Sequence, residues 1–336
     1  MTPTDFARHL HSFLSKHLTM QRNVSVNTIK SYRDTFTLFL RYARDTRGLA
    51  VERLDLNRFD DALAISFLTD LEEQRHCKVT TRNQRLAALH AFARYLQIED
   101  PSRIEQWQRI MAIPFKRHGR HIPVYLTPDE MQAVLAQPDI LTRQGRRDLV
   151  LLSLLYDTGA RVQEVGDLKV HDLRLEPPAH VRLTGKGRKT RVVPIMPNMV
   201  ALLSSHLREM GIDQTARCDS PLFLNVRGQR YTRSGIAIMV QKHVRSARQD
   251  RSGLPDRVTP HTFRHSKAMH MLQAGIPLII IRDFLGHVDI KTSEIYARVD
   301  IEMKRHALEQ LHDTVTPQGL PSWGDDAALM DWLASL

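Results

Sequence analysis

Apolar positions three and four residues apart recur through the first third of the chain. This spacing places apolar side chains along one face of a helix, and it is clearest in residues 29–43 and 82–96. Ser25 and Asn27 are capping candidates before the first of these helices, while Asp100-Pro101 breaks the chain after the second. The pattern predicts a small, all-helical N-terminal domain over residues 1–112.

Residues 113–126 interrupt this periodicity with a basic stretch that lies between prolines. A run bounded by prolines and without apolar spacing is typical of an interdomain linker. Lys116 and Arg117 could bind phosphate groups, and their side chains could equally be exposed to solvent without a binding role. We therefore expect a linker here, and the pattern leaves both interpretations of its charge open.

A larger domain is expected over residues 127–312, since Thr127-Pro128-Asp129-Glu130 has the cap, first-turn proline and acidic residues of a helix start. Residues 146–157 are almost continuously apolar, which predicts a central buried helix ending at Gly159. Residues 181–183 and 190–194 flank the turn Gly185-Lys186-Gly187-Arg188, which is typical of a β-hairpin. The expected fold is therefore mainly α with a small β-sheet, followed by a tail at 313–336.

Composition points to a polyanionic partner. The 336 residues are 42% hydrophobic, and Lys plus Arg exceed Asp plus Glu by 48 to 37, which gives a net charge of +11. The two cysteines, Cys77 and Cys218, lack the spacing of a zinc site or a disulfide framework. No apolar run approaches the roughly 20 residues that span a bilayer, and no signal peptide is evident. We expect a cytoplasmic, nucleoid-associated protein without a metal or other cofactor.

Single motifs in the second domain carry little information on their own. His261 and Arg264 share one face at the start of a predicted helix, yet most such pairs are ordinary surface cations. The stretch from Leu278 to Val299 also fits a helix-turn-helix that reads DNA. Tyr296 within it is by default a core aromatic residue.

The combination carries more weight. Phosphoryl transfer without a metal needs several fixed donors around the phosphate and a nucleophile within reach. Tyr296 could be that nucleophile, and five basic residues could supply the donors: Arg161, Lys186, His261, Arg264 and His287. Arginine suits this task because its guanidinium group binds two phosphate oxygens at once.

The order of these segments resembles the signature of the tyrosine recombinase, or phage integrase, family. The resemblance rests on Thr158-Gly-Ala-Arg-Val-Gln-Glu-Val165, Gly185-Lys-Gly187, His261-Thr-Phe-Arg-His-Ser266, Leu285-Gly-His287 and Ile295-Tyr296. Val26 to Tyr32 resembles the opening of the family's N-terminal core-binding domain, so the likeness spans about residues 5 to 312. Xer-like and transposon-borne integrases are the most similar members, which favours service to a mobile element.

The resemblance implies a role for each residue. Tyr296 attacks a DNA phosphate to form a 3′-phosphotyrosyl link, and Arg161 and Arg264 hold that phosphate. Lys186 protonates the leaving 5′ oxygen, His261 assists proton transfer at Tyr296, and His287 donates to the transition state. Glu164, one helical turn beyond Arg161, orients it. No metal or nucleotide is implied.

The family also implies an assembly. Its helical and mixed α/β catalytic domains clamp double-stranded DNA like a C, and a homo-tetramer acts on two DNA segments. Subunits exchange a C-terminal element, for which residues 301–311 and the tail are candidates; packing of the tail on its own subunit is the alternative. Possible DNA contacts outside the catalytic set are Lys78, Arg82, Arg85, Lys116 and Arg117.

Two other functions remain open on the residues alone. A type IB topoisomerase shares the tyrosine chemistry but relaxes DNA as a monomer, and the separate N-terminal domain and the segment at 261–266 argue against it. A sequence-specific DNA-binding regulator would explain residues 278–299, but it leaves Arg161, Lys186 and the His261–Arg264 pair unexplained. The target DNA sequence cannot be read from the chain, because phosphate contacts carry no base information.

Overall fold

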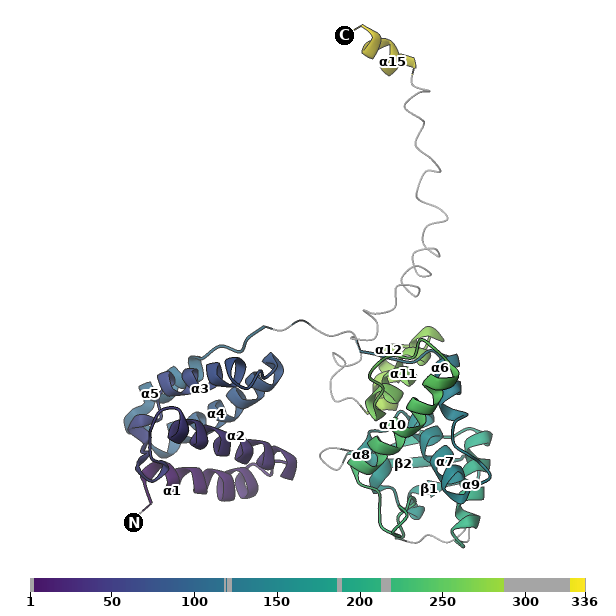
Figure 1. Ribbon diagram of the computed structural model, residues 1–336, viewed down its shortest axis with the longest axis horizontal. Helices are drawn as coiled ribbons and strands as arrows, with labels where there is room; N and C mark the ends of the chain where they lie inside the picture. The colour runs from purple at the N-terminus through teal and green to yellow at the C-terminus, as the bar shows by residue number, and fades with distance from the viewer. Residues whose placement is uncertain are drawn as a thin grey trace. The chain divides into compact units, whose positions relative to one another are not determined.

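The computed structural model describes residues 3–117, 119, 123–185, 189–212, 219–286 and 327–335. Its internal contacts divide the chain into two compact units, residues 1–121 and 122–336. The division falls inside the segment expected as a linker. Figure 1 colours the first unit purple to blue and the second teal through green to yellow, and each unit is described by itself.

The described part of the first unit is helical. Its α-helices are α1 (Asp5–Ser12), α2 (Val26–Asp45), α3 (Asp61–Glu73), α4 (Val79–Glu99) and α5 (Ile104–Ala112). A π-helix, η1 (Phe13–Gln21), continues α1, and three 3-10 turns complete the unit: η2 (Val51–Arg53), η3 (Leu56–Arg58) and η4 (Pro101–Arg103). The predicted all-helical character is confirmed for these residues, and Ser25 caps α2 by accepting from the Thr28 N–H at 3.2 Å.

Aromatic rings fill the core of the first unit. Phe13 and Phe92 are completely buried, and their ring centroids lie 5.2 Å apart. Phe36 meets Phe92 edge to face at 5.1 Å, and Phe6 meets it at 5.7 Å. Such pairs add roughly 0.5–1.5 kcal/mol each beyond the burial of their area. This core holds α1, η1, α2 and α4 together.

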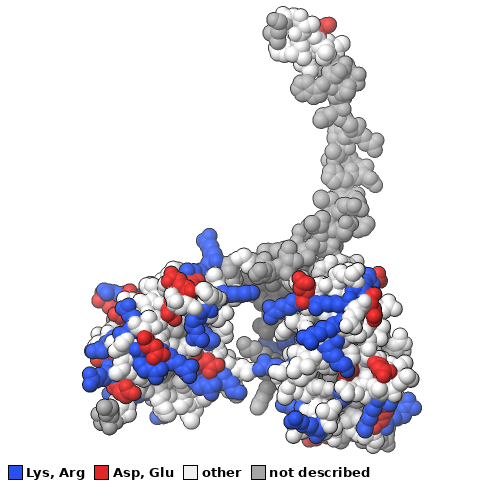
Figure 2. Space-filling model, in the orientation of Figure 1, with Lys and Arg blue, Asp and Glu red and all other residues white. Residues whose placement is uncertain are grey.

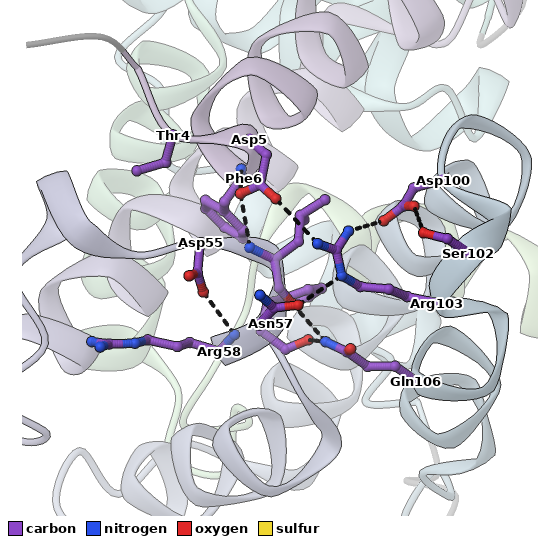
Figure 3. Close-up of polar contacts among 12 residues, drawn as sticks. Thr4, Asp5, Phe6, Asp55, Asn57, Arg58, Asp100, Ser102, Arg103 and Gln106 are labelled. Carbon is purple, nitrogen blue, oxygen red and sulfur yellow. Dashed lines mark hydrogen bonds and ion pairs between the residues drawn. The ribbon is translucent and has the colours of Figure 1, made fainter.

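A polar network ties the first helix of this unit to the last (Figure 3). Arg103 forms ion pairs with Asp100 and with Asp5, and its Nε donates to Asn57 Oδ1 at 2.8 Å. Gln106 of α5 donates to the carbonyl groups of Leu56 and Phe59 at 2.6 and 2.8 Å. These bonds give the Phe59 carbonyl a donor and give the Leu56 carbonyl, which already accepts from the Phe59 N–H, a second one.

The described part of the second unit combines helices with one sheet. Its α-helices are α6 (Pro128–Leu135), α7 (Arg143–Thr158), α8 (Val162–Asp167), α9 (Pro197–Glu209), α10 (Arg233–Asp250), α11 (Pro260–Gln273), α12 (Leu278–Leu285) and α15 (Ala327–Ala334). A 3-10 turn, η5 (Val170–Asp172), precedes the strands β1 (Leu173–Arg174), β2 (His180–Thr184) and β3 (Thr190–Pro194). The predicted combination of many helices with a small sheet is confirmed.

The expected helix ends and hairpin are present. Thr127 and Glu130 form a capping box at α6, and α7 ends at Gly159 in the left-handed conformation. Strands β2 and β3 pair antiparallel, with Leu183 opposite Arg191, and β1 adds a two-residue edge strand on the far side of β2. No pattern in the sequence predicted this third strand.

Helix α7 forms the centre of the second unit. Val150, Leu151, Leu152, Leu154 and Leu155 are all buried in the main cluster of apolar side chains. Helices α9 and α11 both contact α7, as the close passage of these ribbons in Figure 1 illustrates. The prediction of a central buried helix is confirmed, and α11 is thereby fixed against the core.

Two side chains of α11 hold the residue at which the chain enters this unit. The Leu126 N–H donates to Ser266 Oγ at 2.8 Å, and the Leu126 carbonyl accepts from His270 Nε2 at 2.8 Å. Because Nε2 carries the proton, Nδ1 accepts from the Tyr156 hydroxyl at 2.9 Å. Leu126 is completely buried, so its backbone is anchored to the helix that carries His261 and Arg264.

Candidate active site

Four of the seven residues predicted for the catalytic site lie among the described residues. They are Arg161, Glu164, His261 and Arg264, and they come from the start of α8 and the first turn of α11. Lys186, His287 and Tyr296 lie outside the described residues. Gly185 and Gly286, which precede Lys186 and His287 in the chain, are described.

Glu164 holds Arg161 at two points. Its Oε2 accepts from the Arg161 main-chain N–H, and its Oε1 accepts from Arg161 Nη1, both at 2.9 Å. The first bond closes the N-terminus of α8, and the second fixes the direction of the guanidinium group. The Arg161 side chain keeps 34% exposure, whereas that of Glu164 keeps 2%.

Arg264 is buried at 3% exposure. Its Nη1 donates to the Gly159 carbonyl at 2.6 Å, and its Nη2 donates to the Leu285 carbonyl at 2.7 Å. These bonds connect α11 to the end of α7 and to the end of α12. The last carbonyls of a helix have no partner inside the helix and carry negative partial charge, so they suit a guanidinium group.

The end of α12 gathers two further arginines. Arg161 Nη2 donates to the Gly286 carbonyl at 3.3 Å, and Arg191 Nε donates to the Phe284 carbonyl at 2.9 Å. Together with Arg264 on Leu285, three guanidinium groups therefore bind three consecutive carbonyls. Consecutive Cα atoms are about 3.8 Å apart, so this arrangement concentrates positive charge at the point where the chain leads into His287.

Arg191 is a further residue of the cluster, which the sequence motifs predicted only as part of a strand. Its Nη1 and Nη2 donate to Glu164 Oε1 and Oε2 at 3.0 and 2.8 Å, and its side chain is 12% exposed. The signal was its alternation with Val193 and Ile195, which are buried. This spacing places Arg191 on the inward face of β3.

The charges around Glu164 keep it ionised. Burial favours the neutral acid, but the hydrogen bonds and charge of Arg191, followed by those of Arg161, outweigh burial and hold the pKa of Glu164 at about 2. One carboxylate thus faces two guanidinium groups at neutral pH. The cluster retains net positive charge, as an anion-binding site requires.

His261 stands at the exposed edge of this cluster. It lines a surface hollow with Val162 and with Arg233 and Ser234, the first residues of α10. Although the side chain is exposed, partial desolvation, followed by the positive charges of Arg264 and Arg161, lowers the pKa of His261 from its ordinary value. The neutral imidazole is therefore favoured, which is the form that accepts a proton.

Gly185 and Gly286 lie against this cluster. A Cβ atom on Gly185 would come within 2.8 Å of Glu164 Oε1, and one on Gly286 would come within 2.9 Å of Arg191 Cδ. Gly286 has a φ of +66°, which favours glycine. The residues next to Lys186 and His287 are thus at the site.

The residues considered for DNA contact fall into two groups. Arg82 is 6% exposed and donates to the Pro114 carbonyl at 3.0 Å, while Arg85 donates to the Ser31 carbonyl at 3.2 Å. Lys78 and Arg117 are exposed. Arg82 and Arg85 continue the apolar stripe of α4 at spacings of four, which was the sequence signal that they face inward.

Lys116 is exposed but forms an ion pair with Glu72 at 2.7 Å. Asn83 binds the Lys116 main chain twice, with its Nδ2 donating to the carbonyl at 2.8 Å and its Oδ1 accepting from the N–H at 3.1 Å. The start of the linker is therefore held on α3 and α4. Figure 2 shows Lys and Arg spread over the visible face of each unit, with acidic side chains interspersed.

The described residues contain no group of three or more His, Cys, Asp or Glu side chains that could hold a metal ion. Cys77 is a free cysteine, and Cys218 lies outside the described residues. Within the part of the chain that the structure describes, no helix is long and apolar enough to cross a membrane.

Comparison with known proteins places these observations in a family. The model of the phage integrase family matches residues 124–303, and that of the phage integrase N-terminal SAM-like domain matches residues 10–100. The chain is 40% identical over 301 residues to y4rC of Sinorhizobium fredii, an integrase/recombinase by name, with 89% of each chain covered. It is 35% identical to the tyrosine recombinase XerC of Roseiflexus castenholzii, covering 85% of this chain and 88% of that one.

Two solved structures share the fold. The XerH site-specific recombinase bound to its difH substrate aligns with a TM-score of 0.64 and 23% identity, covering 88% of this chain and 83% of that one. The Tn1549 transposon integrase in complex with transposon right end DNA aligns with a TM-score of 0.66 and 18% identity, covering 89% and 98%. The chain belongs to the phage integrase family and is a tyrosine site-specific recombinase.

Proposed function

We propose that this recombinase cuts and rejoins double-stranded DNA with Tyr296 as its nucleophile, in the service of a mobile genetic element. The observation that carries the proposal is that Arg161 lies beside Gly185 and Gly286 while Arg264 binds the neighbouring Leu285 carbonyl. The charges of both arginines also act on His261. These two glycines directly precede Lys186 and His287 in the chain, so the cluster is adjacent in sequence to two further catalytic candidates.

In the proposed cleavage step, the Tyr296 hydroxyl oxygen attacks the scissile phosphorus. The new bond joins this oxygen to phosphorus, and the bond from phosphorus to the 5′ oxygen breaks. His261 takes the tyrosine proton, and Lys186 gives a proton to the departing 5′ oxygen. The 3′-phosphotyrosyl link retains the phosphodiester bond energy, and attack by a 5′ hydroxyl reverses the step and releases Tyr296.

The arginines supply the electrostatic part of this chemistry. Arg161 and Arg264 would bind the non-bridging oxygens, whose negative charge grows in the transition state, and His287 would donate to the same group. Their guanidinium groups are already directed by main-chain carbonyls and by Glu164. Such preorganised donors lose little orientational freedom when the reaction occurs.

We further propose that four copies of the chain act on two DNA segments in the cytoplasm. The recombination sites bound by XerH and by the Tn1549 integrase support DNA as the partner. The transposon origin of the second protein and the integrase name of y4rC support a mobile element. The chain's final helix, α15, has exposed Met330, Trp332 and Leu333 and is a candidate for exchange between subunits; the rest of the predicted exchange segment lies outside the described residues.

A nicked suicide substrate tests the nucleophile. Cleavage next to the nick frees a short fragment that diffuses away, so the covalent protein–DNA adduct accumulates. We expect an adduct with the unaltered protein, none with Tyr296→Phe, and nearly equal DNA binding for both. Tyr95→Phe is the matched control, because Tyr95 packs against Phe13 and Phe92 in the aromatic core of the first unit.

Adduct formation by Tyr296→Phe would exclude Tyr296 as the nucleophile. The absence of an adduct with every protein, the unaltered one included, would favour the DNA-binding regulator. Relaxation of supercoiled DNA without strand exchange between two sites would favour the topoisomerase.

A further inference from the structure

Arg191 joins three separate elements of the candidate site, β3, α8 and α12. It stands on β3, the strand that leaves the turn containing Lys186. Its three guanidinium nitrogens bind Glu164 and the Phe284 carbonyl, and its Cδ lies against Gly286. One side chain therefore contacts both the segment of Arg161 and the segment that leads to His287.

The geometry requires an arginine. Nη1 and Nη2 match the two carboxylate oxygens of Glu164 while Nε donates in a third direction to Phe284. A lysine ammonium is a point charge on a flexible stem and cannot hold both groups in this fixed arrangement. Such a fork–fork pair is among the strongest hydrogen-bonded contacts in proteins.

The location of this pair argues for a role beyond stability. The side chains of Arg191 and Glu164 are 12% and 2% exposed, and burying two charges costs about as much free energy as their attraction returns. What the pair does provide is direction and charge balance. Glu164 also binds Arg161, so a change in the net charge of the Arg191–Glu164 pair alters the electrostatic environment of Arg161.

Without Arg191, one buried carboxylate would face Arg161 alone. The guanidinium group of Arg161 would then be neutralised by Glu164 and would attract a phosphate less strongly. With Arg191 present, two positive groups share one negative group, and a net positive charge remains. The attraction between opposite charges is strong in a partly dehydrated site, so this balance matters there.

We propose that Arg191 is a positioning residue of the active site, which neutralises and orients Glu164 so that Arg161 remains available to bind the scissile phosphate. The inference rests on the proposed role of Arg161. It does not require Arg191 to touch DNA, and it concerns the cleavage step rather than DNA affinity.

The test measures single-turnover cleavage of the nicked substrate by Arg191→Met, with the scissile group either a phosphodiester or a methylphosphonate. Methionine keeps similar bulk and removes the charge. We expect cleavage of the phosphodiester to slow by about tenfold to a hundredfold, as when outer partners of active-site groups are lost. The methylphosphonate lacks the negative charge that Arg161 meets, so the loss there should be at least several times smaller.

The variant Arg182→Met is the matched control. Arg182 lies on β2 in the same sheet, and its Nε and Nη2 both bind Asp172 at 3.1 Å. This substitution removes an ion-paired arginine from the hairpin but leaves the hydrogen bonds of Glu164 in place. Its cleavage rate should equal that of the unaltered protein on both substrates, and thermal unfolding should show that both variants are folded.

A second variant separates charge balance from loss of structure. In Glu164→Gln/Arg191→Met, the carboxylate that Arg191 neutralised is also removed, so phosphodiester cleavage should recover by about threefold or more over Arg191→Met alone. Equal losses on the two substrates, or a double variant slower than Arg191→Met, would overturn the proposal. If Arg161→Ala shows no smaller loss on the methylphosphonate, the role proposed for Arg161 fails instead.

Discussion

Glu164 binds Arg161 through both the main-chain N–H and the guanidinium group, at 2.9 Å each. The Glu164 carboxylate therefore caps the N-terminus of helix α8 and also orients one of the two arginines proposed to hold the phosphate. The spacing of three residues between them makes this double contact possible, since it places Glu164 in the first turn of the helix that Arg161 precedes.

The first prediction concerns acid stability. Because the pKa of Glu164 falls from an ordinary 4.5 to about 2 in the folded protein, its ionised form stabilises the fold above pH 4.5, and this contribution declines as the pH falls toward 2. The free energy of unfolding of the unaltered protein should exceed that of Glu164→Gln at pH 6. That difference should narrow by about 2 kcal/mol by pH 3. Chemical denaturation across this range measures it, and a constant difference would contradict the assigned shift.

The second prediction concerns the two arginines proposed to bind the phosphate. Arg161→Ala and Arg264→Ala should each slow single-turnover cleavage by about a hundredfold to a thousandfold, which corresponds to about 2.7 to 4 kcal/mol of transition-state stabilisation. DNA affinity should change little by comparison. Since Arg264 is buried and bonded to Gly159 and Leu285, its variant should also unfold more easily than that of Arg161. If the cleavage rate of either variant stays within about threefold of that of the unaltered protein, the substituted arginine does not have the proposed role.

The third prediction concerns pH. Cleavage needs a neutral His261 in the proposed mechanism, and the folded protein lowers the pKa of this residue. The rate should therefore begin to fall only below pH 6.5 as the imidazole becomes protonated. A single-turnover rate profile should show this acid limb, and His261→Ala should lose it. His265→Gln should retain the limb, because the pKa of His265 is lowered to about 4 by burial and then by the charges of His261 and Arg264.

The fourth prediction separates two basic residues at the start of α4. Lys78→Ala should weaken DNA binding and reduce the slope of log affinity against log salt concentration by about one, as expected for one lost phosphate contact. Arg82→Met should leave that slope unchanged and lower the free energy of unfolding by about 1 to 3 kcal/mol, because it removes a buried hydrogen bond to Pro114. A reversed pattern would show that Arg82 is the residue that reaches DNA.

The fifth prediction uses two glycines with similar backbone conformation. Gly286 and Gly275 have φ angles of +66° and +76°, so alanine at either position should cost about 1 to 2 kcal/mol of stability. A Cβ on Gly286 would press on Arg191, whereas one on Gly275 would meet nothing within 4 Å. Gly286→Ala should therefore slow cleavage strongly, and Gly275→Ala should not. Equal cleavage rates would show that the contact with Arg191 is unimportant.

Local patterns were sufficient to predict much of the fold. The ends of α7 and α12 follow from Gly159 and Gly286, whose left-handed conformations close both helices, and the hairpin follows from its glycine-rich turn. The two-residue strand β1 is too short to show an alternating pattern, and only its pairing with β2 defines it. Helix α15 lies in a segment whose apolar residues had no assigned structure.

The candidate site was predictable where residues are close in sequence or belong to ordered motifs. The relation of Glu164 to Arg161, and that of His261 to Arg264, follows from a spacing of three. Arg191 could not be recognised in the same way, because its partners Glu164 and Phe284 are 27 and 93 residues away. Its role depends on tertiary packing, which no local pattern records.

The contact of Leu126 with α11 has a mechanical consequence. Both polar groups of its backbone are bound by Ser266 and His270, two and six residues beyond Arg264 on the same rigid helix. Tension along the linker would therefore pull on α11 itself rather than stretch a loose loop. The helix that carries His261 and Arg264 is also the attachment point for the linker, so strain in the linker is borne by the same element that holds two of the candidate active-site residues.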